Sequence, residues 1–363
     1  MKFIYVSEKK DFGGENMIER KIKVLIVDDS ILFRETLAKL LSYGNTIEVV
    51  GKAGDAFEAR DKILELHPDV MTLDVEMPKM NGIQFLKKLI PQYPIPTVIC
   101  SSMPIMAFDA LDAGAVDYVK KPLIKSPDDM QEFANDLKGK IVTASQAKVR
   151  NITRPSSPLP SIANLANGRK SNNNMVIAMG TSTGGTDALQ VVLNDMPTHC
   201  PPIVIVQHMP PVFTKMFAER LNKICAIEIK EAENGDRLKN GLALLAPGDF
   251  QMELKKDSRG YYVKVFRGEK VSGHCPSVNV LFDSVAEVAG KNSIGVIMTG
   301  MGSDGATGLV KMRNAGAYTI GQNRESCVVY GMPMVAFNLG GCSVQAPLDK
   351  ISGVICKKLS MCE

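Results

Sequence analysis

The feature that most constrains the fold of this 363-residue chain is the stretch 175–189, MVIAMGTSTGGTDAL. Five apolar residues predict a buried strand, and glycines at 180, 184 and 185 predict a tight turn into a helix that begins near Thr186. Ser182 lies in that turn, beside helix N-terminal N–H groups, which favour negative charge. Residues 180–184 satisfy the G-x-S-x-G pattern of a nucleophile elbow. A phosphate-binding or purely structural glycine turn fits this stretch equally well.

Length and composition indicate two globular domains. The chain exceeds the usual size of a single core, and its 45% hydrophobic and 23% charged residues are ordinary. A net charge of +4 is too small to imply a polyanionic partner, so we expect no nucleic acid partner. The eight cysteines are scattered without a C-x-x-C pair, which argues against zinc and disulfides and suits a reducing cytoplasm. No apolar run reaches the ~20 residues of a membrane helix, and a signal-peptide pattern is missing at the start. We therefore expect a cytoplasmic protein that is not inserted in a membrane.

In the first half, from Lys21, strand and helix patterns alternate, which predicts a parallel sheet. The five predicted strands are residues 22–27, 47–51, 70–73, 97–100 and 116–119. Polar side chains follow four of these strands, and they are Asp28 and Asp29, Asp74, Ser101, and Lys121. Ligands bind at the carboxyl ends of the strands in such sheets, where three carboxylates would repel one another without a hard cation. Because Mg²⁺ prefers oxygen ligands, the pattern predicts a magnesium site.

Two segments carry little periodicity. Residues 148–174 are rich in Pro, Ser and Asn and read as an interdomain linker. Their basic residues suit a solvated linker better than a nucleic-acid tail. Residues 1–20 are polar, and we expect a loose N-terminal extension. The domain boundaries predicted in this way are 21–147 and 175–363.

The second half places three catalytic residue types after apolar strands. His208 follows the predicted strand 203–206, and Asp304 follows 294–298, so both share the position that Ser182 has after its own strand. A serine needs an adjacent base, and a base histidine needs an acid that fixes its tautomer. Of the four histidines, His208 alone ends a strand of this half. Simpler alternatives are a surface histidine and, for Asp304, a helix N-cap before a glycine. The turn 300–302 also offers N–H groups, and we expect the Met301 amide to be an oxyanion donor.

The first half resembles the receiver domain of two-component response regulators over residues 21–147. In the context LDVEMP, Asp74 falls on the phospho-acceptor of that family. The resemblance implies that Asp28 and Asp29 form the acidic Mg²⁺ pair and that the backbone carbonyl of Glu76 is a further ligand. It also implies three switch residues, namely the hydroxyl of Ser101, the aromatic ring of Tyr118 and the phosphate-binding Lys121.

The second half, from 175 to about 357, resembles the catalytic domain of chemotaxis-specific protein-glutamate methylesterases. The matching stretches are GTSTGG (180–185), QHMP (207–210), HCPSVNVL (274–281) and TGMGSDGA (299–306). The family's nucleophile, base and acid fall on Ser182, His208 and Asp304. The resemblance implies an α/β fold with a doubly wound (βα)5 receiver and a parallel-sheet methylesterase domain.

The activity implied by this resemblance is phosphorylation-regulated demethylation of glutamate methyl esters on methyl-accepting chemoreceptors, with release of methanol, and deamidation of selected receptor glutamines. A chemotaxis histidine kinase would be the phosphodonor. Mg²⁺ is expected at the receiver site, no cofactor is expected for the esterase chemistry, and we expect a monomer.

Three alternatives are weaker. Transcription regulators with receivers carry short helical DNA-binding outputs with a basic recognition helix, which the Gly-rich second half does not suggest. A dinucleotide-binding output would need G-x-G-x-x-G, whereas the turn here is G-x-x-x-G-G. In α/β-hydrolases the order of the triad is Ser, acid, His, whereas this chain has Ser, His, acid.

Overall fold

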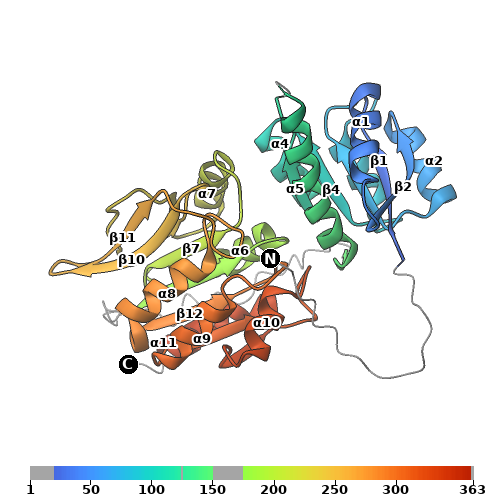
Figure 1. The fold of residues 1–363 in the computed structure, drawn as a ribbon. Helices are drawn as coiled ribbons and strands as arrows, with labels where there is room; N and C mark the ends of the chain where they lie inside the picture. Colours follow the sequence, from blue (N-terminus) through green and yellow to red (C-terminus); the bar gives the residue numbers. More distant parts are fainter. Residues whose placement is uncertain (1–19, 124–125, 150–174, 361–363) are drawn as a thin grey trace, which may run out of the picture.

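The computed structural model describes residues 20–123, 126–149 and 175–360. These form two α/β parts, the first in blue and green and the second in yellow to red (Figure 1). Most of the predicted linker and of the N-terminal extension lies outside the described residues. None of the described helices combines the length and apolarity needed to cross a bilayer.

The first part is a five-stranded parallel sheet with the order β2-β1-β3-β4-β5. This is the doubly wound order 2-1-3-4-5, which has helices on both faces. Its strands are β1 (Ile22–Val27), β2 (Ile47–Ala53), β3 (Val70–Asp74), β4 (Thr97–Ser101) and β5 (Asp117–Lys120). Its helices are α1 (Ile31–Leu41), α2 (Ala56–Leu66), α3 (Gly82–Leu89), α4 (Pro104–Asp112) and α5 (Pro127–Ser145). The predicted receiver-type fold is therefore confirmed.

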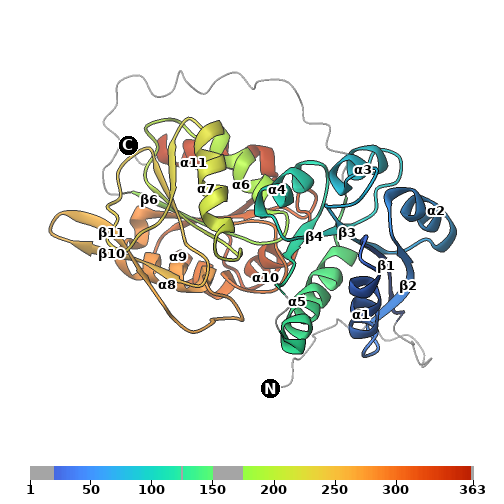
Figure 2. The same ribbon diagram turned by 90° about the horizontal axis from the view of Figure 1, so that it is seen from above.

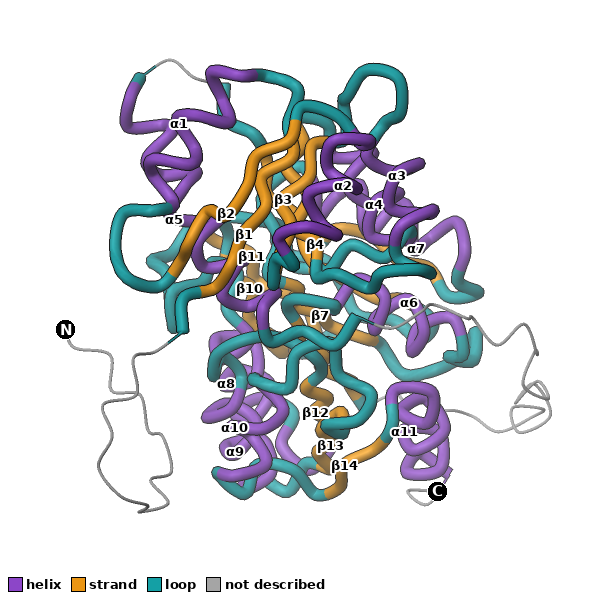
Figure 3. The backbone as a smooth tube through the Cα atoms, turned by 90° about the vertical axis from the view of Figure 1, so that its right-hand side faces the viewer, coloured by secondary structure: helices purple, strands orange, loops and turns teal. Residues whose placement is uncertain are grey.

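The second part is a seven-stranded parallel sheet with the order β14-β13-β12-β6-β7-β9-β8 and a separate antiparallel hairpin, β10–β11. Its strands are β6 (Val176–Thr181), β7 (Ile203–Gln207), β8 (Glu228–Glu231), β9 (Leu242–Leu245), β10 (Gln251–Asp257), β11 (Gly260–Phe266), β12 (Ser293–Ile297), β13 (Tyr318–Gln322) and β14 (Val344–Ala346). Its α-helices are α6 (Gly185–Asn194), α7 (Phe213–Ile224), α8 (Val278–Val288), α9 (Ala306–Asn314), α10 (Met332–Asn338) and α11 (Ile351–Ser360). Figure 3 shows α8, α9 and α10 on one side of this sheet and α6 and α11 on the other.

The central strand β6 explains why the stretch 175–189 is so apolar. Successive side chains of a strand point to opposite faces. Ile177 and Met179 therefore pack in one hydrophobic cluster, whereas Val176 and Ala178 pack in the other. Because helices cover both faces, the strand is continuously hydrophobic rather than alternating.

The second sheet reverses its winding direction at β6. From β6 the chain continues to β7 on one side, and it later crosses to β12 on the other side. Such a reversal opens a crevice at the carboxyl ends of the strands, which is where open α/β sheets bind ligands. Gly184 starts α6 with φ +75°, a left-handed conformation in which glycine is the favoured residue.

The two parts pack against each other through α4 and α7, which lie side by side (Figures 1 and 2). Phe108 of α4 stacks on Phe217 of α7 with ring centroids 5.7 Å apart. Tyr118 of β5 stacks on Phe213, with centroids 4.6 Å apart and planes 11° from parallel. All four aromatic rings are buried, so one hydrophobic cluster continues from the first part into the second.

Candidate active site

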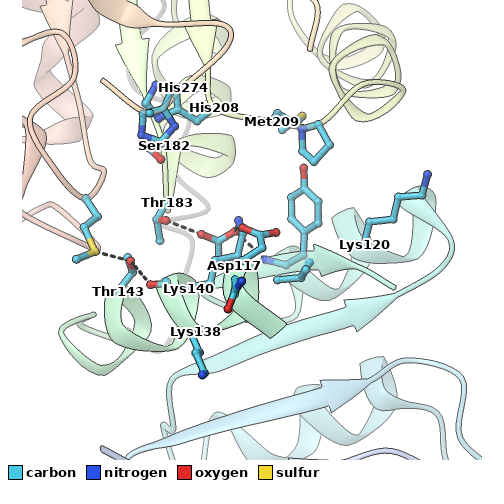
Figure 4. Close-up of a pocket in the computed structure, with 18 of the residues that line it drawn as sticks. Asp117, Lys120, Lys138, Lys140, Thr143, Ser182, Thr183, His208, Met209 and His274 are labelled. Atoms are coloured by element: carbon cyan, nitrogen blue, oxygen red, sulfur yellow. Dashed lines mark hydrogen bonds and ion pairs between the residues drawn. The ribbon is translucent and has the colours of Figure 1, made fainter. Parts of the chain in front are cut away.

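The ends of three neighbouring strands bring Ser182, His208 and Asp304 to one place. Ser182 follows β6, and its N–H donates to the carbonyl of Thr299, 3.0 Å away, in the segment after β12. The N–H of His208 donates to the carbonyl of Thr181 at 3.2 Å, which ties the end of β7 to β6. Figure 4 shows Ser182 directly beside His208. The parallel register of β12, β6 and β7 therefore sets the positions of all three residues.

The two nitrogens of His208 are in different environments. Nε2 lies 2.8 Å from Oδ2 of Asp304. Nδ1 is buried and has no hydrogen-bond partner among the described residues. In a neutral imidazole one nitrogen donates and the other accepts. With Nε2–H donating to Asp304, the lone pair on Nδ1 is available to accept a proton.

Asp304 is held by several donors from the start of α8. Ser277 Oγ donates to Oδ1 at 2.8 Å, and the N–H groups of Val278 and Asn279 donate to its carboxylate at 2.7 and 3.1 Å. Burial acts to raise the pKa of Asp304, but the hydrogen bonds from His208 and from this helix start outweigh burial and lower it. The N-cap of the following helix α9 is Gly305, and Asp304 instead remains a carboxylate that is fixed between the first turn of α8 and His208.

The turn that contains Met301 lies against Ser182. A Cβ added to Gly300 would be 2.7 Å from Cβ of Ser182, so the backbone of this turn approaches the serine closely. Thr143 of α5 donates a hydrogen bond to the sulfur of Met301 (Figure 4). The oxyanion role of the Met301 amide stays a prediction.

A second histidine lies at the site. The rings of His274 and His208 are stacked with centroids 3.7 Å apart and planes 9° from parallel (Figure 4). Burial, and then the neighbouring His208, lower the pKa of His274 to about 4. The position of His274 in the sequence does not indicate a candidate catalytic residue, because it lies in a loop rather than at the end of a strand. Its only signal in the sequence was its place in the matching stretch 274–281.

The predicted receiver site assembles at the carboxyl edge of the first sheet. Oxygen atoms from Asp28, Asp29 and Asp74 all lie within 4.8 Å of one another. Lys121 Nζ is 2.6 Å from Oδ2 of Asp74 and 2.6 Å from Oδ2 of Asp28. Burial raises the pKa of Asp74 to about 6, although Lys121 opposes the shift. This set of closely spaced carboxylates fits a hard divalent cation such as Mg²⁺.

The other predicted switch residues surround this site. Ser101 Oγ accepts a hydrogen bond from the N–H of Met103 at 3.1 Å, so its hydroxyl is engaged within its own loop. The Glu76 N–H donates to Oδ1 of Asp74 at 3.1 Å. Tyr118 is buried at the interface, and its hydroxyl has no hydrogen-bond partner among the described residues.

A cleft of about 1070 Å³ contains Ser182 and His208 and is lined by both parts of the chain. On its receiver side, Asp117 of β5 accepts a hydrogen bond from Thr183 Oγ1 at 2.5 Å. Lys140 Nζ lies 2.8 Å from the other oxygen of Asp117 (Figure 4). The receiver therefore bonds to the residue next to Ser182. Sequence reasoning missed this contact because Asp117 and Thr183 are 66 positions apart and in different domains.

The folds and these side chains define a class: a receiver joined to an α/β hydrolytic domain with serine, histidine and aspartate at its strand ends. Residues 24–134 match the model of the response regulator receiver domain, and residues 177–355 match that of the CheB methylesterase. The chain is 52% identical over 341 residues to protein-glutamate methylesterase/protein-glutamine glutaminase 2 of Syntrophomonas wolfei, covering 94% of this chain and 98% of that protein. It is 44% identical over 344 residues to the Salmonella typhimurium protein-glutamate methylesterase/protein-glutamine glutaminase, covering 94% and 97%.

Among solved structures, the Thermotoga maritima CheB methylesterase catalytic domain matches with 36% identity and a TM-score of 0.50, covering 51% of this chain and 98% of that chain. The chain belongs to the family of protein-glutamate methylesterases/protein-glutamine glutaminases. Because the second half of the chain matches the methylesterase domain, the DNA-binding and dinucleotide-binding alternatives are excluded.

Proposed function

We propose that Ser182 is the nucleophile that hydrolyses glutamate γ-methyl esters on chemoreceptors, with His208 as base and Asp304 as acid. The observation that carries this proposal is the His208–Asp304 pair beside Ser182, with Nδ1 of His208 free to accept a proton. Nδ1 takes the proton of Ser182 Oγ, and Oγ attacks the ester carbonyl. Asp304 stabilises the imidazolium that results.

The products follow from proton balance. His208 returns the proton to the methoxy group, which leaves as methanol while the acyl group stays on Oγ. Water then loses a proton to Nδ1 and attacks the acyl carbon. The bond between this carbon and Oγ breaks, and Nδ1 returns the proton to Oγ, which restores the glutamate carboxyl and the Ser182 hydroxyl. Deamidation of a receptor glutamine takes the same route with ammonia as the leaving group. The Met301 amide is the proposed donor to the oxyanion in both reactions.

Regulation by phosphorylation is assigned to Asp74. Asp28, Asp29, Asp74 and the backbone carbonyl of Glu76 would hold Mg²⁺, which supplies positive charge against the phosphoryl oxygens. A phosphoryl group on Asp74 adds about −2 charge and would draw Ser101 and Lys121 toward it. Tyr118 and Asp117 lie on β5, the strand that leads to Lys121, and contact the catalytic domain, so a shift there loosens the cover over Ser182.

The partners follow from these roles. A chemotaxis histidine kinase supplies the phosphoryl group, and methyl-accepting chemoreceptors are the substrate, so we place the reaction in the cytoplasm, where the kinase works. The proposed monomer consists of a receiver over 21–147, a linker over 148–174 and a catalytic domain over 175–363.

The experiment is methanol release from methylated receptor membranes, with and without acetyl phosphate plus Mg²⁺. We expect release from the unmodified protein that rises with the phosphodonor, none from Ser182→Ala, and no stimulation of Asp74→Asn. Release that persists in Ser182→Ala would remove the serine from the mechanism. Release that does not change with the phosphodonor would leave the esterase but remove the gating.

A further inference from the structure

The stack of His274 on His208 has no part in the triad described above. The two rings are nearly parallel, and both belong to the cleft that contains Ser182. His208 is bonded to protein through Nε2, and its other nitrogen has no partner among the described residues. The covalent bond to Cβ and one hydrogen bond at Nε2 still let the ring rotate about the line between these two points, so a further contact is needed to set its plane.

The loop that carries His274 is firmly anchored. Val271 and His274 exchange two backbone hydrogen bonds, each 3.0 Å long. The carbonyl of His274 also accepts from Nε2 of Gln251 at 3.3 Å, and Oε1 of Gln251 accepts from the N–H of Ser277 at 2.9 Å. Gln251 is buried on β10, so it fixes both ends of 274–277. The segment 274–277 therefore has two contacts with the site. The ring of His274 lies on the face of His208, and Ser277 donates to Asp304, which in turn accepts from the edge of the His208 ring.

We propose that His274 is a positioning residue, whose ring face sets the plane of His208 so that Nδ1 points at Ser182. This inference rests on the proposed function, because it assumes that His208 is the base. It assigns His274 no proton transfer. Its contribution is geometric, and misplacement of a reacting group by about 1 Å can cost on the order of 10²-fold in rate.

The charge of His274 is compatible with this role. The groups that act on its protonation are His208, Asp304, Lys140 and Lys270, and burial acts with three of them to disfavour the charged form. A neutral aromatic face tolerates the cation that forms on His208 during acyl transfer. A charged imidazole in the same place would repel that cation.

The test compares His274→Ala and His274→Phe in the full chain, with phosphodonor and Mg²⁺ present and methylated receptor membranes as substrate. Alanine removes the stacked face, whereas phenylalanine keeps a flat ring without nitrogens. We expect kcat of the alanine variant to fall roughly 10- to 100-fold with KM changed less than about threefold. The phenylalanine variant should recover most of the lost kcat. His199→Ala, at an exposed loop histidine outside the cleft, is the matched control and should match the parent.

Two results would overturn the inference. The first is an alanine variant with the kcat of the parent. The second is a phenylalanine variant as slow as the alanine variant, which would mean that the imidazole nitrogens are needed. If His274→Ala fails to fold, a slow phenylalanine variant would still overturn the inference.

A second readout separates this inference from the proposed function. Phenylmethanesulfonyl fluoride labels activated serines, and mass spectrometry gives the rate of labelling at Ser182. If the parent cleaves no receptor ester, the proposed function fails, but labelling that slows in His274→Ala and recovers in His274→Phe still supports the positioning role. Equal labelling rates in all three proteins, or labelling as slow in His274→Phe as in His274→Ala, would remove it.

Discussion

At the scale of single residues, the site depends on how one carboxylate is held. Asp304 accepts from His208, from Ser277 and from the first amides of α8. Those donors lower the pKa of Asp304 against the effect of burial, so its negative charge would be present when His208 becomes positive in the proposed mechanism. A buried carboxylate without such donors would tend to protonate and lose this effect.

Asp304→Asn should therefore lower kcat for methanol release by about 10⁴-fold, because an amide can donate to Nε2 and favour the wrong tautomer. Ser277→Ala removes one of several donors, and we expect a loss of roughly tenfold at most. Steady-state rates on methylated receptor membranes check both values. Equal losses in the two variants would contradict this division of roles.

His274 predicts a pH dependence of stability. Its pKa is about 4 in the folded protein against an ordinary value of 6.5. Between these values the unfolded chain binds a proton that the folded chain does not, so stability falls as the pH drops from about 6.5 and levels off below about 4. Because the ring is partly exposed, we expect roughly 1–2 kcal/mol rather than the full value of the shift. Urea unfolding at pH 7 and pH 5 should show a smaller pH effect in His274→Phe than in the parent. An identical pH effect in both proteins would contradict the prediction.

The sequence could predict the residues that follow strands, but not those that approach from loops or from another domain. Ser182 and His208 come shortly after apolar runs, and Asp304 follows a third run after a glycine-containing turn; parallel strands bring such ends together. His274 lies in a loop whose path depends on Gln251, more than twenty positions earlier. Asp117 lies in a strand of the other domain. Neither position has a periodic signal, because each depends on tertiary packing.

At the scale of elements, α4 and α7 form the interface, and aromatic packing carries most of it. Phe108 of α4 is 4% exposed and lies against both Phe213 and Phe217. Arg220 of α7 pairs with Asp112 and lies 3.7 Å from Asp109, but its side chain is 29% exposed. Partly exposed ion pairs contribute about 0–1 kcal/mol, whereas loss of a buried phenylalanine costs about 3–5 kcal/mol.

Phe108→Ala should consequently raise methanol release in the absence of phosphodonor, by roughly tenfold or more, because it weakens the closed arrangement by a few kcal/mol. Arg220→Ala is the matched change at the same interface, and we expect less than about threefold. A folded Phe108→Ala protein with parental basal release would show that this packing does not restrain the enzyme.

The central strands β3, β4, β6 and β7 were predictable because all their residues are buried, which makes each a continuous apolar run. In the first part the predicted strands agree with the structure to within two residues at either end. The end of the chain was different. The pattern predicted the strand of β13 but gave no prediction for α10 or β14, which has only three residues. Its short ladder to β13, rather than a run of apolar residues, defines that strand.

At the scale of the whole molecule, the first domain carries one site at the ends of its strands and covers the site at the strand ends of the second domain. The proposed phosphorylation site lies beside the ends of β1 and β3, and the cleft with Ser182 lies against β5 and α5 of the same domain. The contacts between the domains include the aromatic stack, the Arg220 pairs and the hydrogen bonds Thr183–Asp117 and Thr143–Met301. Within the described residues none of these contacts is covalent, so all of them can be released together.

Phosphorylation should therefore expose α7 and the turn at Ser182 as one event. Amides that the receiver covers exchange slowly with deuterium while the domains are closed and faster once the interface opens. We expect acetyl phosphate plus Mg²⁺ to speed exchange in α7 and around Thr183, and to leave β12, in the middle of the catalytic sheet, unchanged as an internal control. Asp74→Asn should show no change in either region. If methanol release rises while α7 keeps its slow exchange, activation occurs within the closed molecule, and the contacts between α4 and α7 are a permanent joint rather than a gate.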